Sequence, residues 1–142
     1  MAFKVNVAGP EPITLNQEQV KHYTFRMETP MDSNARSTDV GCTMVIKGNV
    51  LASVGSQEAE SAINLDKWAQ VPAERPDSYR SLELTEVAAG QVVRKVTFPH
   101  AFVLSYRESF LDDSGNGQFE LIVRQKKDKT AEVRIEGGFA GQ

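Results

Sequence analysis

The second half of the chain carries four segments in which apolar and polar side chains alternate, and each segment is bounded by a turn sequence. These segments are residues 79–87, 92–110, 119–125 and 133–135. Alternation with a period of two places one set of side chains on a buried face and the other on a solvent face. Such a chain is expected to form a curled antiparallel sheet, with little room for a catalytic apparatus.

The connections between these segments predict a meander of neighbouring strands. Residues 88–91 form a short turn containing Gly90, residues 112–117 end in Asn-Gly, and residues 126–129 form a charged tip. Pro99 interrupts the longest segment, and proline cannot donate a hydrogen bond to a neighbouring strand. We therefore expect the chain to bend at residues 98–101.

The first half of the chain predicts further strands and one long polar loop. Residues 3–7, 20–27 and 42–50 alternate, and the last two segments are expected to pair. Residues 30–40 between them are polar and hold few side chains that could anchor a core of their own. This segment is expected to be a long exposed loop.

One helix is predicted, over residues 56–70. Ser56 can cap its first turn, and Lys67 lies near its end, where the helix dipole favours a positive charge. Its apolar residues recur at intervals of three and four, which gives a stripe for packing on the sheet. Pro72 ends it. The predicted fold class is mainly β, a curled antiparallel sheet or β-barrel with one α-helix.

Composition limits the classes of function. The chain has 142 residues, 40% hydrophobic and 25% charged, which predicts a single domain over residues 1–142. Its formal net charge of −3 indicates no general attraction to nucleic acid or to an anionic membrane. No run approaches the roughly 20 apolar residues of a membrane span, so we expect no membrane anchor and synthesis as a soluble cytoplasmic protein.

No catalytic, cofactor or metal site is predicted. Cys42 is the only cysteine, and a thiolate nucleophile would need His22 or His100 as its partner. A lone cysteine in an alternating strand more often packs as a small hydrophobe. We expect no enzyme and no cofactor.

A calcium site in the 112–117 turn is an alternative interpretation of this segment. Asp112, Asp113 and Asn116 could supply oxygen ligands. No glutamate follows at the twelfth position of an EF-hand loop, so the segment is better interpreted as a turn.

The order of these elements resembles that of tube proteins of contractile injection systems, a superfamily that includes the haemolysin-coregulated protein of type VI secretion and phage tail tube proteins. The resemblance is carried by the loop leading into residues 42–50, the helix over 56–70, and the strands over 78–87, 92–110 and 117–125. The only tryptophan is Trp68, on the helix, and the early strands lack the tryptophan and the glycine-rich segment of many secretion-type members. The resemblance is therefore to a divergent member.

The resemblance implies a six-membered ring with a central channel, rings stacked into a tube, and a surrounding sheath. Its implied partners are other copies of the chain and sheath, baseplate or spike proteins, in a phage-like particle or injection apparatus that can be released. In such proteins the loop after the second strand reaches the next ring. The matching residues here are Met31, Asp32, Ser33, Asn34, Ala35, Arg36, Ser37, Thr38, Asp39 and Val40.

Further assembly surfaces are expected on the helix at Trp68 and on the charged tip at Lys126, Lys127 and Lys129. A monomeric β-barrel that binds a small ligand is the alternative function. Self-association without ligand would favour the tube subunit, whereas a monomer that a ligand stabilises would favour the barrel.

Overall fold

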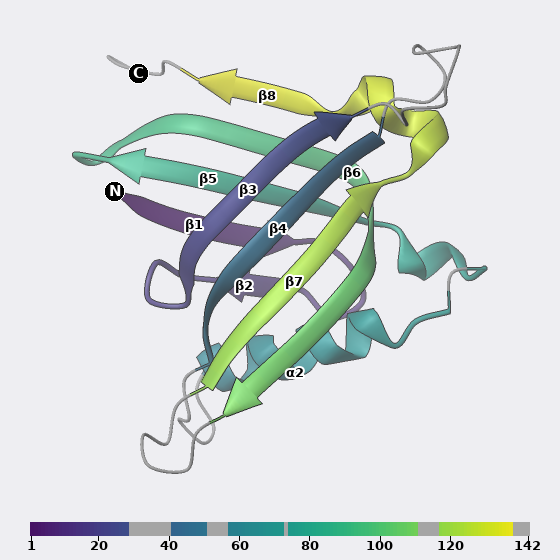
Figure 1. The fold of residues 1–142 in the computed structure, drawn as a ribbon, viewed down its shortest axis with the longest axis horizontal. Coiled ribbons are helices and arrows are strands. Elements are labelled where there is room, and N and C mark those ends of the chain that lie inside the picture. Colours follow the sequence, from purple (N-terminus) through teal and green to yellow (C-terminus); the bar gives the residue numbers. More distant parts are fainter. Residues whose placement is uncertain (29–40, 51–56, 73, 111–116, 138–142) are drawn as a thin grey trace.

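The described residues form one antiparallel sheet of eight strands, with an α-helix and two short 3-10 helices beside it (Figure 1). The computed structural model describes residues 1–28, 41–50, 57–72, 74–110 and 117–137, and for residues 57–59 and 127 only the backbone. The elements are β1 (Ala2–Val7), β2 (Ile13–Leu15), β3 (Val20–Glu28), β4 (Gly41–Val50), α2 (Gln57–Ala69), η1 (Pro76–Ser78), β5 (Arg80–Ala88), β6 (Gln91–Phe110), β7 (Gly117–Gln125), η2 (Lys127–Glu132) and β8 (Arg134–Gly137). The mainly β fold with one helix is confirmed, and β2 is a strand that the sequence pattern did not predict.

Strand β6 belongs to both halves of the sheet. Its first part, residues 91–101, pairs with β5 and β8, and its second part, residues 101–110, pairs with β7. We call β2, β1, β5, β8 and the first part of β6 the first half-sheet. The second half-sheet consists of β3, β4, β7 and the second part of β6, and Figure 1 shows it crossing in front of the first.

The sheet curls without closing. The strand order is β2-β1-β5-β6-β7-β4-β3, and no described strand pairs with β3 on the side away from β4. The two half-sheets meet there through side chains. The rings of Phe3 and Tyr23 pack edge to face at 5.2 Å, and the Tyr23 hydroxyl donates to Glu86 Oε1 at 3.1 Å. Of the two predicted forms, the structure is the curled open sheet.

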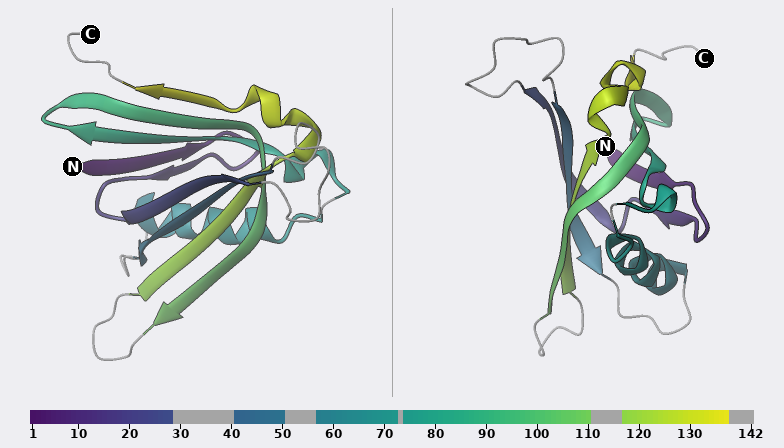
Figure 2. Two further views of the ribbon diagram at one scale, coloured as in Figure 1. Left: turned by 45° about the horizontal axis from the view of Figure 1, so that its top comes forward. Right: turned by 90° about the vertical axis from the view of Figure 1, so that its right-hand side faces the viewer.

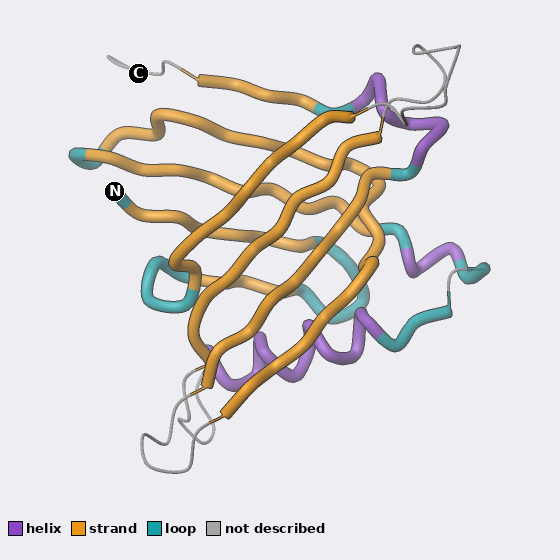
Figure 3. The backbone as a smooth tube through the Cα atoms, viewed as in Figure 1, coloured by secondary structure: helices purple, strands orange, loops and turns teal. Residues whose placement is uncertain are grey.

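The long strand β6 bends, as Figure 3 shows, and strand register places an irregularity at Pro99. Leu82 of β5 pairs with Phe98, but Arg80 pairs with Ala101, so two residues of β6 lie opposite one of β5. This is a β-bulge, which bends the strand and increases its twist. The bend expected at residues 98–101 is present.

A buried glutamine satisfies the backbone at the bulge. The His100 amide donates to Gln125 Oε1 at 2.9 Å, and Gln125 Nε2 donates to the Lys129 carbonyl at 2.8 Å. The Gln125 side chain is fully buried. Because an unpaired buried polar group costs about 1–3 kcal/mol, this one side chain joins the bend, β7 and η2 into a unit.

The core fills the space between the two half-sheets, and the predicted parities are confirmed. Leu82 and Leu84 of β5 face Leu121 and Val123 of β7 in one continuous cluster. All four side chains are fully buried, and burying a leucine contributes about 2 kcal/mol. The largest buried side chains of the described residues are Trp68 and Phe98.

Helix α2 covers the edge of the first half-sheet. Leu65 and Trp68 face the core, whereas Ile63 points to solvent. Ser61 Oγ donates to the Thr14 carbonyl at 2.8 Å and Asn64 Nδ2 donates to the Pro12 carbonyl at 3.4 Å. The helix begins at Gln57, one residue after the predicted start, and Ser56 with its expected cap lies outside the described residues.

Trp68 is a core residue, so its predicted place on an assembly surface is wrong. Its side chain is 1% exposed, and its Nε1 donates to the Ser78 carbonyl at 2.9 Å. The guanidinium of buried Arg80 lies 5.7 Å from the centre of the ring. The helical stripe on which Trp68 lies is the face that packs on the sheet.

Two predicted loops have different outcomes. The charged tip at residues 126–129 forms the start of the 3-10 helix η2. Two backbone hydrogen bonds form this helix before β8 begins. The Lys129 amide donates to the Lys126 carbonyl at 2.9 Å, and the Val133 amide donates to the Thr130 carbonyl at 3.2 Å. The predicted long loop at residues 30–40 lies outside the described residues, as does most of the 112–117 turn.

The turn between β5 and β6 generates a first prediction. Ala89 and Gly90 have φ values of 53° and 76°, as a two-residue hairpin turn of type I′ requires. A left-handed conformation costs an alanine about 1–2 kcal/mol, and asparagine tolerates it better. Ala89→Asn should therefore raise the free energy of unfolding by about 0.5 kcal/mol and Ala89→Val should lower it. Urea denaturation measures both, and a loss of stability in Ala89→Asn would contradict the turn geometry.

Trp68 generates a second prediction. Trp68→Phe should lower the free energy of unfolding by about 2 kcal/mol, because the indole hydrogen bond and part of the buried volume are lost. Ile63→Ala, on the exposed face of the same helix, should change it by less than about 0.5 kcal/mol. Thermal and urea denaturation compare the two variants. Equal effects would show that Trp68 is not packed as described.

Candidate assembly surface

One face of the second half-sheet is bare in the described structure. The right panel of Figure 2 shows this half-sheet edge-on, with α2 and the first half-sheet on one side of it. Met44, Ile46 and Leu121 point to that side and are buried. We call the opposite side the outer face; strand register assigns to it His22, Thr24, Arg26, Glu28, Thr43, Val45, Lys47, Asn49, Phe102, Ser105, Arg107, Ser109, Gln118, Glu120, Ile122 and Arg124.

Three strands contribute one row of alternating charges to the outer face. Lys47 on β4 pairs in register with Glu120 on β7, which pairs with Arg107 on β6. Lys47 Nζ lies 3.5 Å from Glu120 Oε2, and Arg107 Nε lies 3.2 Å from Glu120 Oε1. The carboxylate is 19% exposed, and both cations are more than half exposed. Two solvent-facing cations thus share one partly covered carboxylate.

A second row places two arginines beside one threonine. Arg26, Thr43 and Arg124 are in register across β3, β4 and β7. Arg124 Nε donates to Thr43 Oγ1 at 3.3 Å, and Arg26 Nε lies 3.4 Å from Glu28 Oε1. Among the described residues, no carboxylate forms an ion pair with Arg124.

The second half-sheet has two free edges. Among the described strands, β3 pairs only with β4, and the second part of β6 pairs only with β7 beyond Ala101. These edges run for nine residues on β3 and over residues 102–110 on β6, and neither stretch contains a proline. An edge strand presents unpaired backbone N–H and C=O groups that can pair with another chain. Leu104 on β6 and Met27 on β3 are both about half exposed at these edges.

The first half-sheet protects its edges. Helix α2 covers β2 through a side-chain hydrogen bond to the Thr14 carbonyl of this strand and a second one to the carbonyl of Pro12, just before it. At the other side, β8 is a strand of four residues with Arg134 and Glu136 among them. Short strands and charged residues are devices that prevent edge-to-edge pairing. Of the described edges, those of the second half-sheet are therefore the ones open to pairing with another chain.

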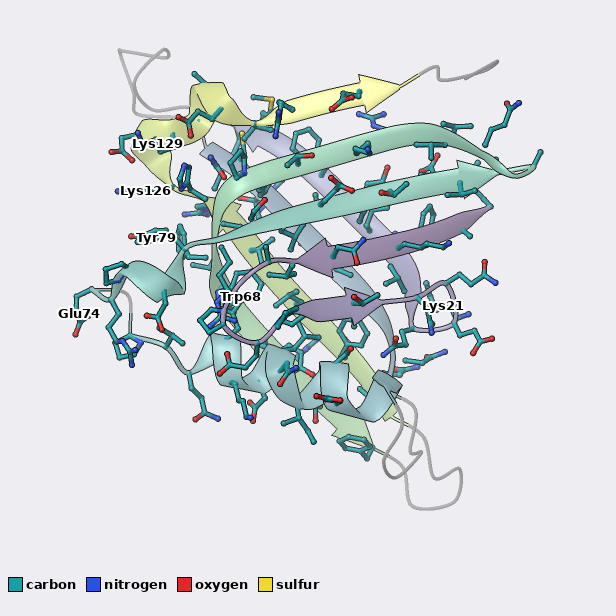
Figure 4. All side chains as sticks on the ribbon, turned by 180° about the vertical axis from the view of Figure 1, so that it is seen from behind. Lys21, Trp68, Glu74, Tyr79, Lys126 and Lys129 are labelled. Atoms are coloured by element: carbon teal, nitrogen blue, oxygen red, sulfur yellow. The ribbon has the colours of Figure 1, made fainter. Side chains whose placement is uncertain are left out.

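Two of the predicted assembly lysines lie at one end of the second half-sheet. Lys126 follows the end of β7, and Figure 4 shows it with Lys129 and Tyr79 beside η1 and η2. Lys126 Nζ lies 5.1 Å from the centre of the Tyr79 ring and 3.9 Å from Asp128 Oδ1, and Lys129 Nζ lies 4.0 Å from Glu132 Oε1. Both lysine side chains are 42% exposed.

These residues border a shallow hollow. It has a volume of about 400 Å³, and its lining includes Glu74, Arg75, Tyr79, His100, Lys126 and Lys129. The Lys127 side chain and residues 31–40 lie outside what the structure describes.

The titratable groups of the sheet do not assemble into a reactive constellation. Cys42 is buried, and burial raises the pKa of its thiol, which disfavours a thiolate. Burial and the hydrogen bond to Glu108 raise the pKa of Tyr106. His100 Nε2 lies 3.0 Å from Glu132 Oε2 at the surface.

Within the described ranges, no group of three His, Cys, Asp or Glu residues could hold a metal ion. No helix among the described residues is long and apolar enough to cross a membrane.

Comparisons with known proteins show what this fold is similar to. No family model matches the sequence, and no curated protein matches it significantly. Solved structures do match. Hcp1 from Flavobacterium johnsoniae is 16% identical, with 97% of each chain covered and a TM-score of 0.61.

Two other matches come from extracellular or phage-derived particles. A chain of the PVC sheath–tube complex, an extracellular contractile injection system in its extended state, is 14% identical, with 96% of this chain and 89% of that chain covered and a TM-score of 0.54. A chain of the six-fold symmetrised baseplate of the anti-feeding prophage is 14% identical, with 96% and 93% covered and a TM-score of 0.55. The chain therefore has, over nearly its whole length, the fold shared by Hcp1 and by chains of contractile injection systems.

Proposed function

We propose that this chain is the subunit of a tube, in which six copies form a ring and rings stack inside a contractile injection system or phage-like tail. The observation that carries the proposal is the second half-sheet, with its two free edges and with the rest of the subunit on one side. The similarity to chains of a sheath–tube complex and of a six-fold symmetrised baseplate supports it.

Edge pairing between copies explains how a ring could close. The half-sheet has four strands in antiparallel order, so β3 and the second part of β6 run in opposite directions. If β3 of one copy lies beside β6 of the next, every strand in the ring is antiparallel to both neighbours. This contact is heterologous, since two different edges meet, and such contacts generate closed rings when the rotation fits.

The interior of the subunit favours this function over a ligand-binding barrel. The space between the half-sheets holds fully buried apolar side chains, among them Phe98, Ile46 and Leu121. A binding barrel instead keeps a cavity with a few convergent polar groups. A structural role also fits the buried thiol and the lack of a reactive constellation among the described residues, and we infer that the chain is not an enzyme.

One end of the second half-sheet is proposed as the surface between stacked rings. β3 ends at Glu28 and β4 begins at Gly41 at this end, and residues 31–40 lie between the two strands in the sequence. Arg124 pairs with Thr43 at the start of β4, which places Lys126 and Lys129 at the same end. We propose that residues 31–40 and these lysines contact the next ring, and that sheath and baseplate proteins contact the outside of the tube.

The two edges can be tested separately. Leu104→Asp on β6 and Met27→Asp on β3 each place a charge at one edge, where the native side chain is about half exposed. Each variant should stay folded but remain monomeric, because a ring needs both edges of every copy. Ile63→Asp, on the exposed face of α2, is the matched control and should assemble as the native chain does. Light scattering coupled to size-exclusion chromatography, followed by negative-stain microscopy, measures assembly.

Mixing the two edge variants provides a sharper test. Each variant keeps one intact edge, so a mixture should form heterodimers through the single remaining interface and should not form rings. A native chain that stays monomeric at every accessible concentration would contradict the proposal. Rings formed by both edge variants would show that copies associate through another surface.

A further inference from the structure

The outer face carries a charge opposite in sign to that of the whole chain. Register places the cations Arg26, Lys47, Arg107 and Arg124 on it, against the carboxylates of Glu28 and Glu120. The chain as a whole has a formal net charge of −3. The outer face thus carries an excess of positive charge within a chain that is negative overall.

The paired carboxylates do not neutralise this face. Glu120 lies between Lys47 and Arg107 and can compensate only one of them. Glu28 lies beside Arg26, and Arg124 has a threonine hydroxyl as its partner. In each of the two rows, therefore, a guanidinium or ammonium group can form an ion pair with a further carboxylate.

The spacing of the two rows suits an extended chain. Thr43 and Lys47 are four residues apart on β4, which corresponds to about 13 Å along a strand. The row between them contains Val45 and Ile122, whose side chains are partly exposed. An extended segment with acidic side chains about four residues apart could thus contact both basic rows, with an apolar side chain over the middle row.

A hollow at one end of the face extends the basic surface. Its volume is about 650 Å³, and its lining includes Lys21, Lys47, Arg107, Glu108 and Glu120. Figure 4 shows Lys21 at the end of the molecule opposite Lys126. Lys21 is the cation that this lining adds to the row of Lys47, Glu120 and Arg107.

We propose that the outer face binds acidic, extended polypeptide segments, and that it selects such segments for passage. The selection of segments for passage rests on the proposed function. In a ring closed through β3 and β6, the bulk of each subunit must lie outside the ring, so the outer face would line the channel. Nucleic acid is disfavoured, since Glu28 and Glu120 lie within the face and Phe102 is the only phenylalanine, tyrosine or tryptophan that strand register assigns to it.

Binding of fluorescein-labelled poly-L-glutamate to the native full-length chain tests the proposal by fluorescence anisotropy. The double variant Lys47→Gln with Arg124→Gln removes one cation from each row. The control Lys4→Gln with Lys95→Gln removes the same charge from the first half-sheet, where Lys4, Thr85 and Lys95 are in register. Affinity should fall about tenfold in the outer-face variant and less than about twofold in the control.

A conservative variant and a second probe keep the test decisive. Arg124→Lys should retain most of the affinity, because it keeps the charge, and higher salt should weaken binding of the native chain. Equal losses in both double variants, or no binding by the native chain, would overturn the proposal. Tighter binding of a single-stranded DNA oligonucleotide than of poly-L-glutamate would overturn it in favour of nucleic acid.

Microscopy of the same samples separates this proposal from the proposed function. Rings that do not bind the peptide would reject the peptide site and leave the tube subunit intact. Monomers that bind it, with the loss confined to the outer-face variant, would support the site and reject the tube.

Discussion

The bend in β6 is the constraint on which the rest of this structure depends. One strand supplies an inner member of the first half-sheet and an edge of the second, so the angle between the halves is set where its pairing partner changes. The bulge at Pro99 produces that change of direction, and Gln125 accepts the hydrogen bond of the His100 amide. Without that buried amide group, the bend would leave backbone groups unsatisfied in the interior. The packed core, the bare outer face and the position of η2 follow from this arrangement.

Much of the fold could be predicted from the sequence, because most of its elements are local patterns. The alternation of β5 and β7 assigned their buried faces correctly, and Pro99 located the bend. Strand β2 was not predicted, because its three residues are too few to show an alternation of apolar and polar side chains. The role of Gln125 could not be predicted either, because its partner on β6 is 25 residues away. The helical stripe predicted that α2 packs on the sheet, but Trp68 was assigned to a surface when the same stripe buries it.

The candidate site was harder to predict for a related physical reason. A free edge is a property of strand order, and strand order depends on contacts between segments far apart in the chain. Likewise, strand register alone brings together the row of Lys47, Glu120 and Arg107, because these residues lie on three different strands. The alternation of charged and apolar residues on these strands suggested a solvated or channel-lining face, without indicating which cations would share it. Resemblance in element order supplied the functional expectation that residue patterns alone did not.

The second half-sheet is assembled from two distant parts of the chain, and this affects when it can form during synthesis. β3 and β4 are complete once residue 50 has been made, whereas β6 and β7 are complete only at residue 125. A nascent chain therefore exposes one of the two edges of the proposed ring contact long before the other exists. Because joining requires both kinds of edge, neighbouring nascent chains on one messenger would have little opportunity to polymerise before release. The order of strands along the gene thus separates folding from assembly in time.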